Sequence, residues 1–264
     1  MRAALPQWSR DKGWGVLLLV YSALLSRGCE AITADMDTHT RLVDSLGYCS
    51  MELVNLLLTG TAVSNVFDGC QQFGEAASDV SASAGVAAAG ADGDQLVLRG
   101  VEKRARVGLL TLFEWYRYMT VGQNMKSPQF PVWVVCSESH FSVLALSSHS
   151  SCSASNHSSS SSSSGNSCVA TRQQQQVGMD TAVLKPSAGV PLLLQFYDGL
   201  AKQEGPIVLE LKPAGARQGW SSLLEGVSEE RGVWQGRPIP PLECVVETKW
   251  RDTAVLWHGS DPIL

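Results

Sequence analysis

The sequence predicts an α+β domain, and three observations support this class. The first half of the chain carries apolar segments typical of helices, and the second half carries short β-rich runs separated by turn residues. Helices that precede antiparallel strands in this way are typical of α+β proteins. The length of 264 residues and a hydrophobic content of 44% allow a sizeable buried core.

Three segments are expected to be helical. Trp14–Ser26 is apolar around its whole circumference, which predicts a helix packed inside the domain. Within Gly47–Gly60, Ser50 can cap a helix that Gly60 can end. Gly108–Met119 has apolar residues at helical spacing and is expected to be a core helix.

The later part of the chain is expected to form a sheet. Pro131–Cys136 is a continuous β-rich run, and Phe141–Leu146 alternates between two faces, so the two should form a hairpin with Ser137–His140 as its turn. The further strand candidates are Pro191–Tyr197, Pro206–Leu211, Glu243–Lys249 and Ala254–Trp257.

Two low-complexity stretches interrupt this pattern. One, at about 74–94, is rich in Ala, Gly, Ser and Asp, and the other, at about 147–190, contains serine and glutamine tracts. Neither can bury enough side chain to offset the entropy of ordering, so both are expected to be flexible insertions. The chain 1–264 is then a single, partial domain.

Charge and cysteine spacing limit the partners and the compartment. A net charge of -5 gives no electrostatic footprint for nucleic acid or an anionic membrane, so neither is expected as a partner. The 7 cysteines form no C-x-x-C pair, so no metal site, cofactor or disulfide framework is expected, and reduced thiols favour the cytoplasm or nucleus. A secretory reading of the apolar run Val16–Leu25 remains as an alternative, although the run is too short to span a bilayer.

His140 is the candidate catalytic residue from spacing. It opens its strand, where solvent and substrate can reach the ring, and antiparallel pairing with the strand that ends at Tyr197 brings Asp198 close to it. A carboxylate there can orient an imidazole that acts as a base. Two structural explanations stay open: a satisfied histidine beside a sheet, and Asp198-Gly199 as a simple turn.

Several blocks resemble the carboxy-terminal half of the catalytic domain of the MINDY deubiquitinases. They are "GYCSMELVNLLLTGTAVSNVFDG", "GLLTLFEWYRYMTVGQNMKSPQFPVWVVCSESHFSVL", "FYDGLA" and "PPLECVVETKWRDTAVLWHGSDPIL". The resemblance implies a papain-like cysteine peptidase fold, incomplete at its amino-terminal side, and a ubiquitin carboxyl-terminal hydrolase that cleaves polyubiquitin of the proteasome-targeting linkage type. It also implies that His140, within Ser137–Ser142, is the general base.

The family's nucleophile is a cysteine in a Pro-Cys-Gly turn upstream of these blocks, and the sequence contains no such tripeptide. The chain is therefore expected to be inert alone, whether through a truncated gene model or as a shortened form. Cys49 is the fallback nucleophile, because it precedes a helix and lies upstream of His140. A structural cysteine at a helix start is the simpler explanation.

Two residues of the block "LTGTAVSNVFDG", Asn65 and Asp68, are candidate contacts for an extended ubiquitin tail, although capping and turn formation also explain them. The expected partners are ubiquitin and polyubiquitin chains. The rival from another functional class is a catalytically inactive ubiquitin-binding or scaffold protein.

Overall fold

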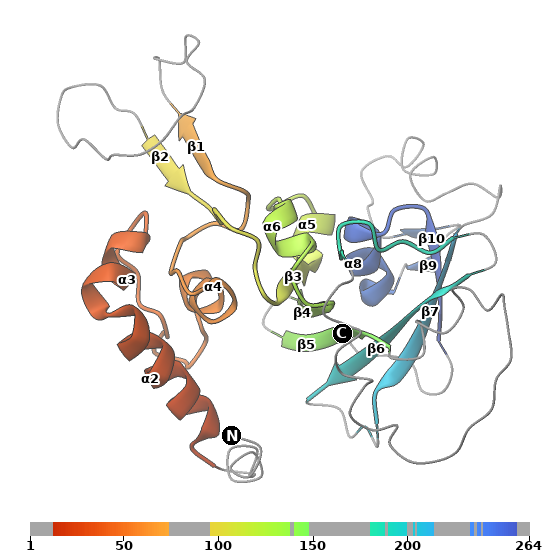
Figure 1. Ribbon diagram of the computed structural model, residues 1–264, viewed down its shortest axis with the longest axis horizontal. Coiled ribbons are helices and arrows are strands. Elements are labelled where there is room, and N and C mark those ends of the chain that lie inside the picture. Colours follow the sequence, from red (N-terminus) through yellow and green to blue (C-terminus); the bar gives the residue numbers. More distant parts are fainter. Residues whose placement is uncertain are drawn as a thin grey trace, which may run out of the picture. The chain divides into compact units, whose positions relative to one another are not determined.

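The computed structural model describes residues 13–73, 96–137, 140–147, 180–187, 190–199, 203, 205–213, 233–234, 237–238 and 240–257. The chain divides into two compact units, Met1–Lys103 and Arg104–Leu264, each of which is described by itself (Figure 1). The first expected insertion and most of the second lie outside the described residues.

The described part of the first unit consists of helices and a two-stranded antiparallel ribbon (Figure 1). Their bounds are α2 Gly15–Arg27, α3 Cys29–Asp35, α4 Met51–Thr59, β1 Cys70–Phe73 and β2 Leu96–Arg99. α4 confirms the expected helix: the Ser50 side chain accepts a hydrogen bond from the Leu53 N–H, and Gly60 ends the helix with a φ of 86°.

The helix α2 forms as expected, but the prediction that it is buried is wrong. Only Gly15 is buried, and Val16 and Leu25 are 74% and 80% exposed. A single stripe, Val20, Ala23 and Leu24, packs against the small core of this unit. No described helix alone is long and apolar enough to cross a membrane; α2 and α3, bent by 84° at their junction, pass that test of length and composition only as a pair.

The second unit is built on one six-stranded mixed sheet of order β10-β7-β6-β5-β4-β3, in which only β3 and β4 are parallel. This arrangement supports the α+β class. The strands are β3 Gly108–Thr111, β4 Val132–Ser137, β5 His140–Leu146, β6 Leu192–Asp198, β7 Ile207–Pro213 and β10 Thr253–Trp257. A separate two-stranded ribbon consists of β8 Val233–Trp234 and β9 Arg237–Pro238.

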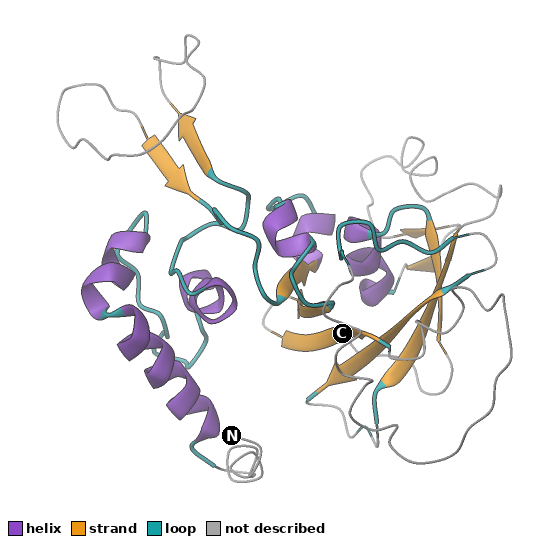
Figure 2. Cartoon of the chain, in the orientation of Figure 1, coloured by secondary structure: helices purple, strands orange, loops and turns teal. Residues whose placement is uncertain are grey.

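One face of this sheet carries the core of the unit. The helix α8, Pro241–Lys249, and the short helix α5, Leu112–Trp115, contribute to it, and α6, Gln123–Lys126, precedes β4 (Figure 2). Rows of inward side chains run across the strands, including Trp133, Leu144, Phe196 and Leu209. The opposite face is more open, and Val143 and Tyr197, which pair across it, are 36% and 49% exposed.

The expected core helix Gly108–Met119 is only partly correct. Its first four residues form β3, which is buried along its whole length and pairs with β4, and only Leu112–Trp115 is α-helical. The switch occurs at Thr111, whose hydroxyl accepts the Phe113 N–H at 3.2 Å and so caps the helix. A short apolar run fits a buried strand as well as a helix, which explains the error.

Gly108 is expected to be a position where no side chain is tolerated. A Cβ there would overlap the Met125 carbonyl oxygen and the Trp133 indole. We expect Gly108→Ala to lower the free energy of unfolding by about 3 kcal/mol, because backbone and a buried ring must both move. Gly205→Ala is the matched control, since a Cβ at Gly205 meets nothing within 4 Å. Equal unfolding midpoints for the two variants in thermal denaturation would contradict the packing described here.

The expected strand Glu243–Lys249 is wrong, because these residues belong to α8. Pro241 occupies the first turn, where a missing N–H costs nothing. Leu242, Val245 and Val246 then recur at helical spacing and are fully buried. The adjacent valines suggested a strand, but burial of this helical face decides the structure.

Burial in α8 makes the stability of this unit depend on pH. Desolvation raises the pKa of Glu243 from 4.5 to about 7, so the folded chain keeps a proton that the unfolded chain releases between these values. Stability should therefore fall as pH rises from 4.5 through 7. We expect Glu243→Gln to raise the unfolding free energy at pH 8 by about 1 to 2 kcal/mol, a gain that solvent screening reduces because the side chain is only partly buried. At pH 4.5 the unfolding free energy should change little.

Thermal unfolding of the Glu243→Gln variant at the two pH values checks this. The control is Glu210→Gln, because Glu210 lies 3.1 Å from Lys212 in an ion pair and its loss should bring no gain at pH 8. A gain of the same size at both pH values for Glu243→Gln would show that ionisation is not the cause.

The segment 180–187 lies inside the range assigned to the second insertion, yet it packs against this unit. Thr181 is fully buried. Arg104 donates hydrogen bonds to Asp180 and Thr181, both at 2.8 Å, and the Trp250 indole N–H donates to the Leu184 carbonyl at 2.8 Å. These contacts hold the chain in place before β6 begins.

Candidate functional site

His140 is placed by the register of the sheet at the end of one row of inward side chains. It is the first residue of β5 and pairs with Ser137, the last residue of β4. The next row along the same face joins Val135, Ser142 and Asp198. Asp198 on β6 is thus the diagonal neighbour of His140 on the adjacent strand β5, within reach of a side-chain contact.

The imidazole of His140 faces the carboxylate of Asp198. His140 Nε2 lies 2.9 Å from Asp198 Oδ1, and the side chains are 21% and 3% exposed. Nε2 itself is shielded from solvent, and an N–H on it is poorly aligned with the Asp198 carboxylate for a hydrogen bond. Such bonds between catalytic groups are often poorly aligned before substrate binds.

Asp198 is held at its position by the end of β6. Its backbone N–H donates to the Gln203 side-chain oxygen at 2.7 Å, and Asp198 is buried directly beside Ser142 in the sheet. A buried carboxylate next to Nε2 favours the tautomer that carries its proton on that nitrogen. Nδ1, the nitrogen that does not face Asp198, is then available to accept a proton.

Ser142 is a residue of this site that the sequence did not single out. It is 3% exposed, it pairs with Asp198, and its Oγ has no hydrogen-bond partner among the described residues. An unsatisfied buried hydroxyl is costly. A small movement of the neighbouring imidazole or carboxylate would give the Ser142 hydroxyl a hydrogen-bond partner. Its position two residues after His140 on the same strand face was a signal that could have identified it.

Two of the described cysteines, Cys136 and Cys244, lie in the same unit as His140. Cys136 is buried and lies on the other face of β4, because its neighbours Val135 and Ser137 are the residues in register with the His140 face. Cys49 is exposed just before α4 in the first unit, whereas His140 belongs to the second. In α8, burial is the main cause that raises the pKa of Cys244 to about 12, which opposes formation of a thiolate.

Asn65 and Asp68 belong to the first unit, whereas His140 belongs to the second. The Asn65 side-chain amide donates to Asp37 Oδ2 at 2.7 Å and to the Arg99 carbonyl at 2.9 Å. Asp68 is exposed and forms an isolated bridge with Val101. The amide nitrogen of Asn65 therefore has a structural role, and a substrate contact for either residue stays a prediction.

Metal ligation is not a feature of the part of the chain that the structure describes. No group of three or more His, Cys, Asp or Glu side chains there has the geometry to hold an ion. An imidazole paired with a buried carboxylate is an arrangement that can transfer protons.

Comparisons with known proteins identify the family. The model described as "Deubiquitinating enzyme MINDY-3/4, conserved domain" matches residues 1–162. "Probable ubiquitin carboxyl-terminal hydrolase MINDY-4" of Homo sapiens is 36% identical over 253 residues, which cover 95% of this chain and 26% of that protein. "Ubiquitin carboxyl-terminal hydrolase MINDY-3" of Mus musculus is 42% identical over 144 residues, 53% of this chain and 28% of that protein.

The chain thus spans about a quarter of the length of these relatives. No solved structure matches it. The family model covers more than half of the chain, and the resemblance of the blocks around His140 is therefore confirmed. The chain belongs to the MINDY-3/4 family of deubiquitinating enzymes.

Proposed function

We propose that this chain supplies the base side of a cysteine-type deubiquitinase site that cleaves isopeptide bonds in polyubiquitin of the proteasome-targeting linkage type. The observation that carries the proposal is the 2.9 Å approach of His140 Nε2 to the buried Asp198 carboxylate. A base oriented by a third group is the arrangement that activates a thiol or hydroxyl nucleophile. The names of the relatives, ubiquitin carboxyl-terminal hydrolases, support the substrate class.

In this proposal His140 handles the protons of both halves of the reaction. Nδ1 accepts the thiol proton as the sulfur attacks the isopeptide carbonyl, and the imidazolium then returns that proton to the leaving lysine amine. Water, deprotonated by the same imidazole, hydrolyses the thioester and restores the thiol. Asp198 stabilises the transient imidazolium throughout.

The nucleophile in this proposal comes from a Pro-Cys-Gly turn, which the 264-residue sequence does not contain. A papain-like fold is proposed on the same basis. It is supported by a sheet with its histidine at a strand start and with helices on the core face. A catalytic domain of that fold needs a helix whose amino end lowers the thiol pKa, together with donors for the oxyanion.

A ubiquitin-binding or scaffold role without catalysis is the second candidate. It is favoured by the open sheet face that includes Val143 and Tyr197. Both candidates predict binding of ubiquitin, and they differ in whether His140 matters once a nucleophile is supplied.

Two measurements on the chain test the proposal. A ubiquitin probe with a carboxy-terminal electrophile should leave every cysteine unmodified, and covalent capture at Cys49 would contradict the account of the nucleophile. Titration with ubiquitin dimers of the proteasome-targeting linkage should show saturable binding that is stronger than for head-to-tail dimers. Equal affinity for the two dimers would contradict the proposed linkage, and lack of binding would remove the scaffold role as well.

A further inference from the structure

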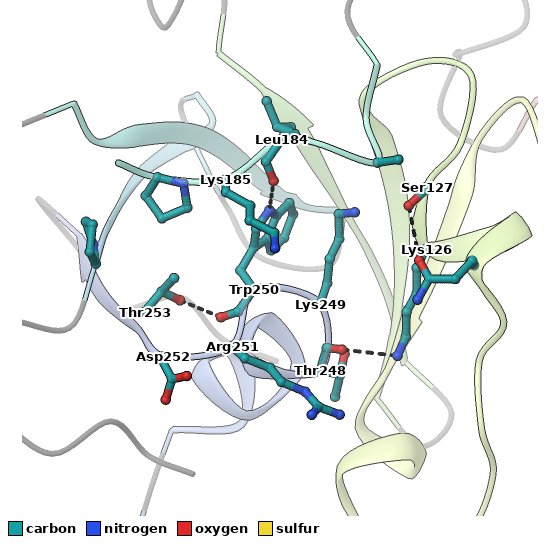
Figure 3. A pocket seen from close by; sticks show the side chains of 14 residues that line it. Lys126, Ser127, Leu184, Lys185, Thr248, Lys249, Trp250, Arg251, Asp252 and Thr253 are labelled. Atoms are coloured by element: carbon teal, nitrogen blue, oxygen red, sulfur yellow. Dashed lines mark hydrogen bonds between the residues drawn. The ribbon is translucent and has the colours of Figure 1, made fainter. Parts of the chain in front are cut away.

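A cavity of about 490 Å³ lies in the second unit, and His140 is not among its described lining residues. Figure 3 shows the side chains that line it. Its wall includes Pro213, the last residue of β7, and Thr253, the first residue of β10, which pair with each other. Lys126 lies before β4, whereas His140 follows the end of β4. The cavity and His140 therefore lie at opposite ends of the strands of the same sheet.

Basic side chains dominate the lining of this cavity. Among the described residues, Lys126, Lys185, Lys249 and Arg251 contribute to its wall, and Asp252 is the one carboxylate that does (Figure 3). They come from α6, from the segment before β6, and from the end of α8 with the turn that follows it. Segments far apart in the sequence thus bring four cations to one concave surface, which is unlike the single solvated face of a charged helix.

Lys249 is the most constrained of these cations. Its Nζ lies 5.3 Å from the ring centroid of Trp133 and 5.1 Å from that of Trp250, two buried indoles, and it donates to the Thr181 carbonyl at 3.3 Å. Within the described residues, the ion pairs include neither Lys249 nor Lys185. The rings fix the ammonium in place but supply no negative charge.

The carboxylates around the cavity offset only part of its charge. Glu114 Oε1 lies 2.8 Å from Lys126 Nζ, and Asp252 lies beside Arg251. Asp180 pairs with Arg104, and burial raises the pKa of Glu247, behind the Asp252 backbone, to about 7. Among the described residues, Lys185 and Lys249 are therefore left as the excess positive charge of the wall.

The effect of this excess is visible at Lys249 itself. Burial, together with the charges of Lys126, Arg104 and Lys185, lowers its pKa to about 8. The ammonium is still mostly protonated at neutral pH, but it is destabilised. A bound anion would relieve both the desolvation and the repulsion.

We propose that this cavity binds the phosphate group of a small molecule. An excess of two positive charges matches a phosphate dianion, whereas a carboxylate neutralises only one of them. The wall hydroxyls of Ser127, Thr248 and Thr253 already donate hydrogen bonds within the protein, so the ammonium groups are the donors for the phosphate. A volume of about 490 Å³ is within the usual range for small-molecule sites, so the phosphate could be inorganic or part of a small phosphomonoester.

The test is calorimetric titration of the whole chain with inorganic phosphate, with glycerol 3-phosphate and with acetate, at constant ionic strength set with chloride. We expect saturable phosphate binding and no saturable acetate binding. The neutral variants Lys249→Met and Lys185→Met should each weaken phosphate binding about 10-fold, the loss expected for one charge-assisted hydrogen bond. Methionine keeps the length of the aliphatic stem, so packing against the indoles is preserved.

The matched control is Lys212→Met, which removes one positive charge from the opposite, outer face of β7, where Lys212 pairs with Glu210. It should bind phosphate as the unmodified chain does. Lys185 is exposed, so Lys185→Met keeps the test valid if Lys249→Met unfolds. Tighter binding of glycerol 3-phosphate than of phosphate would identify an organic phosphate as the source, and tighter binding of phosphate the free ion.

Three outcomes would overturn the proposal. They are lack of saturable phosphate binding, acetate binding of equal strength, and an equal affinity for phosphate in the Lys185→Met, Lys249→Met and Lys212→Met variants. The last would show that bulk positive charge, rather than this cavity, attracts the anion.

Discussion

Replacing His140 with alanine is expected to reduce ubiquitin-dimer cleavage by about 10³-fold or more, because the base that forms the thiolate is then missing. The assay needs a nucleophile, which a chimera can provide. In it, the part of human MINDY-4 that precedes the matched region is joined to this chain, which aligns with that protein over 95% of its length. Initial rates of dimer cleavage, followed by gel or fluorescence, measure the effect.

The matched control for this variant is Phe141→Ala. Phe141 follows His140 directly but points to the opposite face of the sheet and is 37% exposed. It should retain cleavage within a few-fold of the unmodified chimera. A His140→Ala chimera as active as this control would show that His140 is a structural histidine, and the scaffold role would then be favoured.

Asp198→Asn should give the second largest loss of activity, about 10²-fold or more in the same chimera. Asparagine keeps the size of the side chain, so the sheet should remain intact. It removes the charge that stabilises the imidazolium and allows the imidazole to adopt the wrong tautomer. The loss should appear mainly in kcat, since Asp198 is 2% exposed and cannot contact a large substrate directly.

Tyr197→Phe is the control for Asp198→Asn, because Tyr197 is the preceding residue on the other, solvent-exposed face of β6. The variant keeps the aromatic ring on that face, so its activity should stay within a few-fold of the unmodified chimera. If Asp198→Asn retained more than half of the activity, Asp198 would be a turn residue that happens to lie near the histidine.

Sequence reasoning located the hairpin and the approach of Asp198 to His140, and the reason is the period of a strand. Once Phe141–Leu146 is read as alternating, the antiparallel pairing of the next apolar run fixes which end meets His140. The structure has these two strands as β5 and β6, with Ser142 opposite Asp198. The catalytic roles of the two residues stay predictions.

The errors fall where tertiary packing decides between helix and strand. Gly108–Thr111 is short and mostly apolar, and Glu243–Lys249 is short with two adjacent valines among mostly polar residues. Each was assigned the wrong state. Gly108 permits the close approach of Trp133 that β3 requires, a constraint that cannot be read from a single sequence. The exposure of α2 also depends on which elements surround it, and not on its own composition.

The basic cavity could not be predicted from the sequence either. Lys126, Lys185 and Lys249 are more than 50 residues apart from one another along the chain, and none belongs to a motif. They meet only because α6, the segment 180–187 and the end of α8 lie at the same end of the strands of the sheet. The prediction of Glu243–Lys249 as a strand also gave the wrong direction for Lys249, which the structure places at the end of α8 and in the cavity wall.

The position of one proton on His140 tests the central claim most directly. Nitrogen-15 NMR of the chain labelled in its histidines, assigned with the His140→Ala variant, reports which ring nitrogen is protonated above the imidazole titration. The geometry predicts a proton on Nε2, facing Asp198, and a bare Nδ1. A proton on Nδ1 would leave no acceptor for the thiol on that nitrogen, and the role of His140 as the deubiquitinase base would be contradicted.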